Sequence, residues 1–282
     1  MLVQKQIDDF VMNLNINDGG ISSVLYYQGG REKAFMSLLN ETVQEGMTCL
    51  DLGGNIGYTT LPMLRNVGSE GFVYAVEPDS QSIGILTKNV EDNGYNDRCE
   101  VMQCAISGHD GVEVFWEASK PNLSSVKKNK YSTTKKEVPC FSLNTFLQDR
   151  RYPNFIKMDV EGHEVKIFEG GLDYFTKNEG HTNILLEVHP NTYDNDNDFE
   201  KILREYFKIG FNSKWVVATP IPQPQLFKMA GYEPVKTIHT DGFHRGLYNN
   251  VSNDHLAKFA CHEHREGTSR KIIRSFMITR EA

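Results

Sequence analysis

The alternation of strand-like and helix-like segments after residue 47 constrains the fold of this chain more than any other feature. Short apolar runs are separated by longer segments whose apolar residues recur every three or four positions. Strands joined through helices run parallel with right-handed crossovers, so this order predicts a doubly wound, mostly parallel α/β sheet. Seven runs are expected to be its strands: MTCLDL, FVYAVE, CEVMQCAI, NFIKMDV, NILLEVH, SKWVVA and RKIIRSFMITR.

The segments on either side of this alternation predict two additions to the core. Residues 1–46 are expected to form an N-terminal helical cap, because apolar residues recur at helical spacing over 7–14 and 34–39. Residues 47–219 form the predicted core. Residues 220–282 are expected to contain an irregular insertion and the last strand of the sheet, and this part of the chain is a candidate for determining substrate specificity.

An antiparallel excursion interrupts the alternation. VEVFWEA and EVPCFSL are typical of two strands around a polar loop near 119–137. A lysine-rich loop of this kind favours a solvated hairpin tip, and a docking arm for an anionic substrate is the alternative. The lysines concerned are Lys120, Lys127, Lys128, Lys130, Lys135 and Lys136.

Charge and cysteine content narrow the function and the compartment. The chain has 30 Lys and Arg against 37 Asp and Glu, a net charge of −7, which argues against sequence-independent binding of nucleic acid. The five cysteines are odd in number and show no paired spacing, so reduced thiols and a cytoplasmic location are expected. The N-terminus does not resemble a signal peptide, and no stretch approaches the roughly 18 apolar residues of a membrane span.

The segment LDLGGNIGYTTL, residues 50–61, follows the first core strand and opens a helix. Glycines in this setting let a ligand approach the backbone. The spacing Asp51-x-Gly53-x-Asn55-x-Gly57 departs from the pattern of dinucleotide-binding proteins, and an acid precedes the glycines. Asp51 would repel a pyrophosphate and attract an ammonium group, so a sulfonium cofactor fits better than NAD. The alternative is that Asp51 only caps the helix.

The next two strand ends are expected to complete the cofactor site. The second core strand ends in Glu77-Pro78, where a carboxylate can accept hydrogen bonds from both ribose hydroxyls. The third strand leads into Ala105, which is expected to flank the adenine. The alternative for Glu77 is an exposed strand end without a ligand.

Titratable side chains are concentrated where the fourth and fifth core strands end. Because neighbouring parallel strands lie about 5 Å apart, we expect these groups to meet where a transferred methyl group would arrive. A carboxylate or an imidazole there can remove the proton of an acceptor hydroxyl, or the cluster could hold Mg²⁺ instead, although no spacing specifies a metal. The candidates for catalysis are Asp159, Glu161, His163, Glu187 and His189, whereas Glu164 is expected to be a structural acid at a helix start.

Residues 45–190 resemble the FkbM family of S-adenosylmethionine-dependent methyltransferases. DLGGNIGYTTL is similar to the family's cofactor loop, VEP to its ribose-binding acid, and KMDVEGHEVKIFEGG with LLEVH to its hallmark segments. The resemblance implies a Rossmann-like class I fold and O-methylation of hydroxyls on small metabolites or sugars. It places S-adenosylmethionine on Asp51, Gly53, Asn55, Gly57 and Glu77, and the active site on Asp159, Glu161, Glu187 and His189.

The expected function is therefore an O-methyltransferase that acts on a small molecule or a carbohydrate, with neither nucleic acid nor membrane as a partner. Two alternatives stay open. One is an RNA ribose 2′-O-methyltransferase that uses Asp159 with nearby lysines, and the other is a non-catalytic module that binds S-adenosylmethionine. The acceptor and the oligomeric state do not follow from the sequence.

Overall fold

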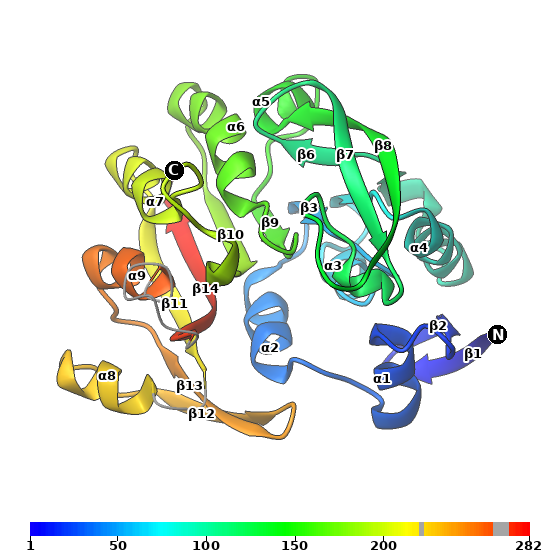
Figure 1. Ribbon diagram of the computed structural model, residues 1–282, viewed down its shortest axis with the longest axis horizontal. Helices are drawn as coiled ribbons and strands as arrows, with labels where there is room; N and C mark the ends of the chain where they lie inside the picture. The colour runs from blue at the N-terminus through cyan, green and yellow to red at the C-terminus, as the bar shows by residue number, and fades with distance from the viewer. Residues whose placement is uncertain (220–222, 262–270) are drawn as a thin grey trace.

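The computed structural model describes residues 1–219, 223–261 and 271–282, and Figure 1 shows helices arranged around a central sheet. The described sheet has nine strands in the order β12-β13-β11-β14-β10-β9-β3-β4-β5. All of them run in one direction except β13 and β14, so the predicted doubly wound, mostly parallel sheet is confirmed. The strands are β3 (Thr48–Leu52), β4 (Phe72–Val76), β5 (Cys99–Met102), β9 (Phe155–Met158), β10 (Thr182–Glu187), β11 (Asn212–Ala218), β12 (Lys236–Thr240), β13 (Phe243–Tyr248) and β14 (Ile273–Arg280).

The seven predicted strands form the continuous part of this sheet from β11 to β5, and two more extend its β11 edge. The extra strands β12 and β13 lie in the segment predicted to be irregular, so that prediction is wrong there. They are joined at Asp241-Gly242, whose φ angles of +52° and +77° suit a two-residue hairpin turn. The same segment contains the helices α8 (Gln223–Met229) and α9 (Asn253–Ala260).

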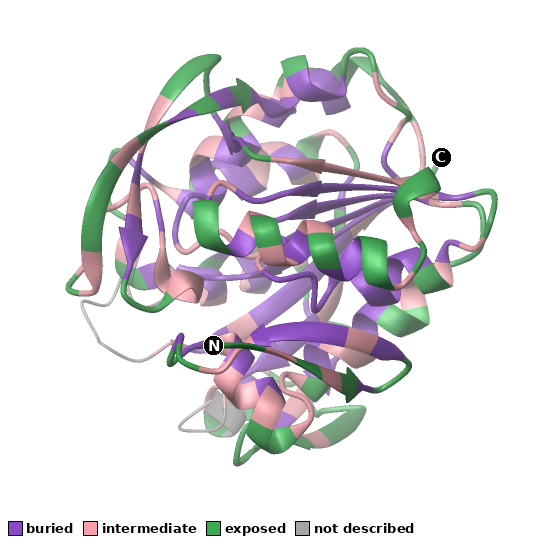
Figure 2. Cartoon of the chain, turned by 90° about the vertical axis from the view of Figure 1, so that its right-hand side faces the viewer, coloured by how far each residue is buried: buried purple, intermediate pink, exposed green. Residues whose placement is uncertain are grey.

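Helices follow the parallel strands as the sequence predicts: α3 (Thr60–Asn66), α4 (Ser80–Asp92), α6 (Glu164–Lys177) and α7 (Phe199–Lys208). Successive strand residues point to opposite faces of a sheet. Leu50 and Leu52 therefore belong to one buried core and Cys49 to another. Figure 2 shows the central strands buried along their length, as expected of a sheet covered on both faces.

The N-terminal cap differs from the prediction in its first half. Residues 7–14 do not form a helix, because β1 (Leu2–Ile7) and β2 (Phe10–Asn15) pair as an antiparallel hairpin. The apolar residues of β2 also alternate, so their spacing fits a strand as well as a helix. Packing of this segment against α4 favours the strand. Asn13 donates from its backbone to Asn89 Oδ1 at 2.6 Å. The helix predicted over 34–39 is confirmed as α2 (Lys33–Thr42), and a further helix that was not predicted, α1 (Ile21–Gln28), precedes it.

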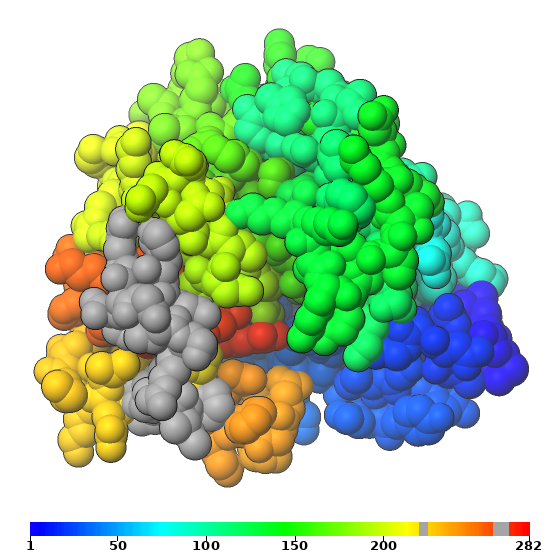
Figure 3. Space-filling view, in the orientation of Figure 1, coloured from blue at the N-terminus to red at the C-terminus, as the bar shows by residue number. Residues whose placement is uncertain are grey.

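The antiparallel excursion is confirmed for β7 (Gly111–Ala118) and β8 (Ser132–Ser142), and β6 (Ala105–Ser107) pairs with β8 in parallel to complete an arm of three strands. The predicted third core strand is split, since β5 stays in the main sheet and β6 joins the arm. The lysine-rich loop folds back onto the protein: Lys127 donates to Thr192 O at 2.6 Å, and Lys128 lies over the Trp116 ring. In Figure 3 the arm, in green, lies beside the red start of β14 on one face of the molecule.

Three further features are a short helix, the state of the cysteines and the character of the helices. The short helix α5 (Leu143–Leu147) follows Ser142, whose hydroxyl accepts from Thr145 N. None of the five cysteines, all of which lie in the described ranges, forms a disulfide bond. Among the helices of the described ranges, none has the length and apolar character needed to cross a membrane.

Candidate active site

A cavity of about 320 Å³ lies where the main sheet, the arm and the N-terminal cap meet. In a parallel α/β sheet, ligands bind at the carboxyl ends of the strands, and this cavity is bounded by residues that follow β3, β4, β9 and β10. Ten of the twelve predicted site residues line it: Gly53, Asn55, Glu77, Pro78, Ala105, Asp159, Glu161, His163, Glu187 and His189. Asp51 and Gly57 are outside the lining.

The glycine loop after β3 is shaped by close contacts that exclude side chains. Gly53 has a φ of +78°, and a Cβ atom there would lie 2.0 Å from the carbonyl oxygen of Asp159. Gly57 has a φ of +91° and lies against Leu86 of α4, outside the lining of the cavity. The glycine loop is therefore packed directly against the end of β9, which carries the candidate catalytic acids.

Asp51 is placed differently from the prediction. Its side chain is buried, its Oδ2 accepts hydrogen bonds from Thr59 and Thr60 at 2.9 and 2.7 Å, and Lys157 Nζ lies 3.0 Å from Oδ1. A lysine ammonium thus already neutralises this carboxylate. The predicted contact of Asp51 with an ammonium group of the cofactor is wrong for this geometry, and Asp51 acts on the loop from inside the protein.

Glu77 occupies the position predicted for a ribose-binding acid. It lines the cavity, although only 5% of its surface is exposed. Its two oxygens accept from the backbone of Asp79 at 2.7 Å and of Asn55 at 2.8 Å. Burial raises the pKa of Glu77 to about 7 despite these hydrogen bonds. The backbone bonds hold the carboxyl group in one orientation beside the glycine loop.

His189 is the centre of a cluster of four acids. Its Nδ1 lies 2.7 Å from Glu164 Oε1, within hydrogen-bonding distance. Its Nε2 lies 3.6 Å from both Glu161 and Glu187 and 3.8 Å from Asp159. Burial alone would lower the pKa of His189, but these carboxylates, led by Glu164, raise it to about 9. The imidazole therefore carries a proton at neutral pH.

The acids around His189 differ in protonation. Burial favours the neutral form of Asp159, but Lys157 and His189 outweigh it and lower the Asp159 pKa. Burial raises the pKa of Glu161 to about 7, with the Asp159 charge adding to the shift. Burial also raises the pKa of Glu187, which is opposed by Arg274, 2.5 Å away. The pKa of Glu161 thus lies close to neutral pH, whereas that of Asp159 lies below its ordinary value.

His163 does not belong to this cluster. It borders the cavity, but its Nε2 lies 2.9 Å from Ser107 Oγ of the arm. Burial lowers its pKa to about 4, so the ring is neutral. The structure therefore separates His163 from the other candidate catalytic residues, because His163 forms its hydrogen bond with the arm.

Several cationic residues of the cavity were missed by the sequence prediction. Lys157 lies in the buried strand β9 and donates to Gly53 O at 2.6 Å. Arg31 and Arg274 both pair with Glu32. A lysine inside the apolar run FIKM is a signal that could have indicated Lys157, whereas the loop containing Arg31 has no distinguishing pattern.

Asp159, Glu161 and His189 also form a group whose potential ligand atoms lie within 4.8 Å of one another. Magnesium prefers oxygen ligands and near-octahedral geometry. Here one of the three groups is a protonated imidazole, which already supplies positive charge to the carboxylates. An ion bound through the His189 imidazole would have to displace that proton.

Comparison with known proteins gives short sequence matches and broad structural ones. The chain is 43% identical over 56 residues to the tRNA wybutosine-synthesizing protein 2 homolog of Rattus norvegicus, which is 20% of this chain and 13% of that protein. The human homolog is 41% identical over 56 residues, 20% of this chain and 12% of that protein. The match thus covers about an eighth of these relatives' length.

Among solved structures, a methyltransferase FkbM from Methylobacillus flagellatus matches with 14% identity and a TM-score of 0.43, covering 72% of this chain and 43% of that one. M. jannaschii TYW2 in complex with AdoMet matches with 12% identity and a TM-score of 0.45, covering 100% of this chain and 87% of that one. An O-methyltransferase from Bacillus cereus in complex with SAH has 14% identity and a TM-score of 0.44, with 92% and 96% covered.

The model of the methyltransferase FkbM domain matches residues 51–213, which is more than half of the chain. This range begins at the glycine loop and includes the ends of β4, β9 and β10 that line the cavity. The resemblance drawn from the sequence is confirmed. The chain belongs to the FkbM family of S-adenosylmethionine-dependent methyltransferases.

Proposed function

We propose that this protein transfers the methyl group of S-adenosylmethionine to a hydroxyl of a small metabolite or a sugar. The observation that carries the proposal is the packing of Gly53 against Asp159, which brings the cofactor loop and the candidate catalytic acids to the same cavity. Proximity of this kind is required because methyl transfer proceeds in line between donor and acceptor.

The residues that would hold the donor lie on the β3 and β4 side of the cavity. Gly53 and Asn55 offer a backbone surface without large side chains, and Glu77 presents a fixed carboxyl group that suits a vicinal diol. Pro78 and Ala105 supply apolar surface for the adenine. S-adenosylmethionine supplies an activated methyl group on a sulfonium sulfur.

Glu161 is the residue best suited to act as the base. His189 is already protonated, and Asp159 is a weak base because its pKa is lowered. Glu161, with a pKa of about 7, accepts the hydroxyl proton while the acceptor oxygen gains the methyl group and the carbon–sulfur electron pair stays on sulfur. The products are a methyl ether, S-adenosylhomocysteine and protonated Glu161.

The charges of the cavity favour a neutral acceptor. Each of its described basic side chains already has an acidic partner: Arg31 with Glu32, Lys157 with Asp51, and Lys271 and Arg274 with Glu187. An anionic acceptor would have to compete with these ion pairs. A polyhydroxylated compound can instead exchange hydrogen bonds with the carboxylates, which supports a sugar or a similar metabolite.

Calorimetric titration with S-adenosylhomocysteine, followed by a methyl-transfer screen over sugars and other hydroxylated metabolites, tests the proposal. With an active acceptor, Glu161→Gln should bind S-adenosylhomocysteine within about threefold of wild type and lose roughly 10²- to 10⁴-fold in kcat. Glu91→Gln, an exposed change on α4, is the matched control. A folded protein that binds no S-adenosylhomocysteine rejects the proposal, and one that binds it but methylates nothing is a non-catalytic module.

A tRNA acceptor is the second candidate, because the sequence matches of 56 residues are to proteins named for tRNA wybutosine synthesis. The net charge of −7 opposes it. Binding of total tRNA at increasing salt separates the two candidates: a steep fall of affinity with salt, together with label transfer to tRNA, favours the second.

A further inference from the structure

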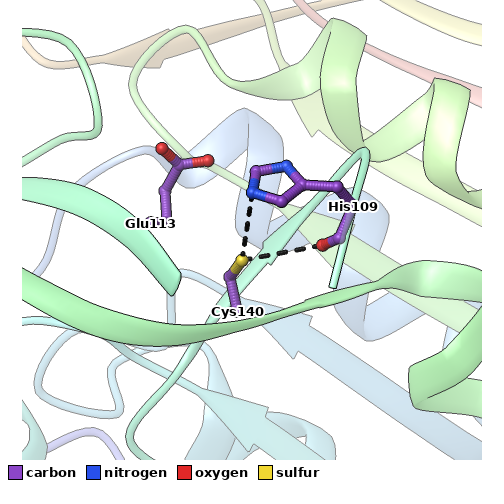
Figure 4. Close-up of side chains that lie close together, drawn as sticks. All are labelled: His109, Glu113 and Cys140. Carbon is purple, nitrogen blue, oxygen red and sulfur yellow. Dashed lines mark hydrogen bonds between the residues drawn. The ribbon is translucent and has the colours of Figure 1, made fainter. Parts of the chain in front are cut away.

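A second cluster of side chains lies on the arm, outside the residues assigned above. His109, Glu113 and Cys140 each offer one potential ligand atom, and these atoms all lie within 4.8 Å of one another. Figure 4 shows the imidazole of His109 and the carboxylate of Glu113 on the same side as the thiol of Cys140. We propose that these three residues form a binding site for a zinc ion.

The backbone of the arm brings the three residues together. Gly111 and Glu113 of β7 pair with Cys140 and Val138 of β8. Residues two apart in a strand share a face of the sheet, so Glu113 and Cys140 are diagonal neighbours on one face. His109 precedes Gly111 in the turn between β6 and β7, and its ring lies beside the thiol. No long or unsupported loop is needed to assemble the set.

The geometry suits zinc in particular. Zinc binds thiolate at about 2.3 Å and imidazole at about 2.0 Å with tetrahedral angles, which places the sulfur and the nitrogen roughly 3.5 Å apart. Cys140 Sγ lies 3.6 Å from His109 Nε2. The carboxylate of Glu113 completes a set of sulfur, nitrogen and oxygen donors, which favours a borderline-soft ion over Mg²⁺ or Ca²⁺.

The surroundings hold two of these donors in place. Ser107 Oγ donates to Glu113 Oε2 at 3.1 Å and lies 3.5 Å from His109 Nδ1. A metal-bound imidazole commonly uses its other nitrogen for such a partner. Asp110 is engaged elsewhere, since it accepts from Ser142 N at 2.7 Å and from Thr145 Oγ1 at 2.8 Å. Three protein ligands leave a fourth zinc position for water.

The accessibility of the donors also fits an ion that enters from solvent. Cys140 has 1% of its surface exposed and belongs to the small core of the arm, whereas His109 is exposed. Burial disfavours the ionised form of a thiol, and coordination by zinc favours it. The ion would tie the β6–β7 turn to β8 beside Ser107, whose hydroxyl also contacts His163 at the cavity wall.

Cobalt(II) is the probe for this site, because thiolate ligands give it a near-ultraviolet charge-transfer band. The full chain, stripped of metal by a chelator and kept reduced, is titrated with Co²⁺ and then with Zn²⁺. We expect a charge-transfer band that saturates at one equivalent and disappears when Zn²⁺ displaces Co²⁺. Absence of the band from the folded protein would overturn the proposal.

Variants assign the ligands. Cys140→Ser should abolish the band, and Cys99→Ser, which changes a thiol of β5 instead, should keep it. Because Cys140 is buried, the exposed His109→Ala is the second variant, and it should weaken Co²⁺ binding at least about tenfold with an unchanged circular dichroism spectrum. A band that survives Cys140→Ser, or an affinity that His109→Ala leaves unchanged, contradicts the site. None of these readouts depends on methyl transfer, so the proposed function and the zinc site can fail separately.

Discussion

The regions around His189 and His163 lie on the same cavity but leave their histidines in opposite charge states. Around His189, the strand ends of the main sheet supply four carboxylates, which raise the pKa of the imidazole to about 9. Around His163, the arm supplies a hydroxyl at 2.9 Å and one carboxylate 3.9 Å away, and burial lowers the pKa to about 4. Burial is similar in both, so the number and distance of the acidic partners decide the charge.

Removing the acid that contributes most to the charge of His189 should have the largest effect. Glu164→Gln replaces a fully buried carboxylate that contacts His189 Nδ1 at 2.7 Å. Breaking one side of a buried ion pair is strongly destabilising, so we expect the free energy of unfolding to fall by about 3 kcal/mol or more in urea denaturation. The exposed Glu169→Gln in the same helix is the control, with a change of less than about 0.5 kcal/mol. Equal stability of the two variants would show that Glu164 does not compensate the charge of His189.

The pH dependence of stability should separate the two histidines next. The pKa of His189 is raised from 6.5 to about 9, so its contribution is fully present below pH 6.5 and is lost as the pH rises through 9. The pKa of His163 is lowered from 6.5 to about 4, so its contribution is present above pH 6.5 and is lost as the pH falls through 4. Each shift corresponds to a free energy on the order of 3 kcal/mol.

Imidazole proton shifts in nuclear magnetic resonance check this directly. His189→Gln and His163→Gln assign the two signals by their disappearance. We expect one signal to titrate near pH 9 and the other near pH 4. Two signals that both titrate near pH 6.5 would remove the contrast between the regions.

Ser107→Ala tests the arm side of the comparison with a smaller expected effect. It removes the hydroxyl that contacts His163 Nε2, which leaves a buried polar atom without that partner. The expected loss of stability is about 1–3 kcal/mol, measured by urea denaturation. Ser69→Ala, in an exposed loop, is the control and should change stability by less than about 0.5 kcal/mol. A neutral Ser107→Ala would mean that His163 needs no partner from the arm.

Removal of Mg²⁺ should have the smallest effect. Because protonated His189 already supplies positive charge to Asp159 and Glu161, we expect less than a twofold change in the rate of methyl transfer when EDTA is added. The assay compares EDTA with an equal amount of EDTA already saturated with Mg²⁺. A rate that falls with EDTA and returns with added Mg²⁺ would assign a metal to the cluster.

The parts of the molecule that could be predicted from the sequence are those fixed by chain order. The run of strands and helices placed Glu77, Asp159 and His189 at the correct edge of the sheet, because parallel strands end on the same side. The hairpin of residues 2–15 could not be distinguished from a helix, because its apolar residues satisfy both periods until α4 packs against β2. The Asp241-Gly242 dipeptide is a local signal in the sequence for the hairpin turn between β12 and β13.

The charge states of the site residues could not be predicted from the sequence, because they depend on partners from distant segments. Asp51 was expected to attract the donor, but Lys157 of another strand neutralises it. His163 and His189 look alike in sequence, because each has a glutamate two residues before it. Only the pairing of strands and the position of the arm show that one faces four acids and the other a serine.

The contact between Gly53 and Asp159 limits how this enzyme can diversify. Since even one methyl group does not fit between the donor loop and the end of β9, neither can be remodelled without disturbing the other. New acceptor preferences are therefore easier to acquire through the peripheral elements, such as the arm, than through the strand ends.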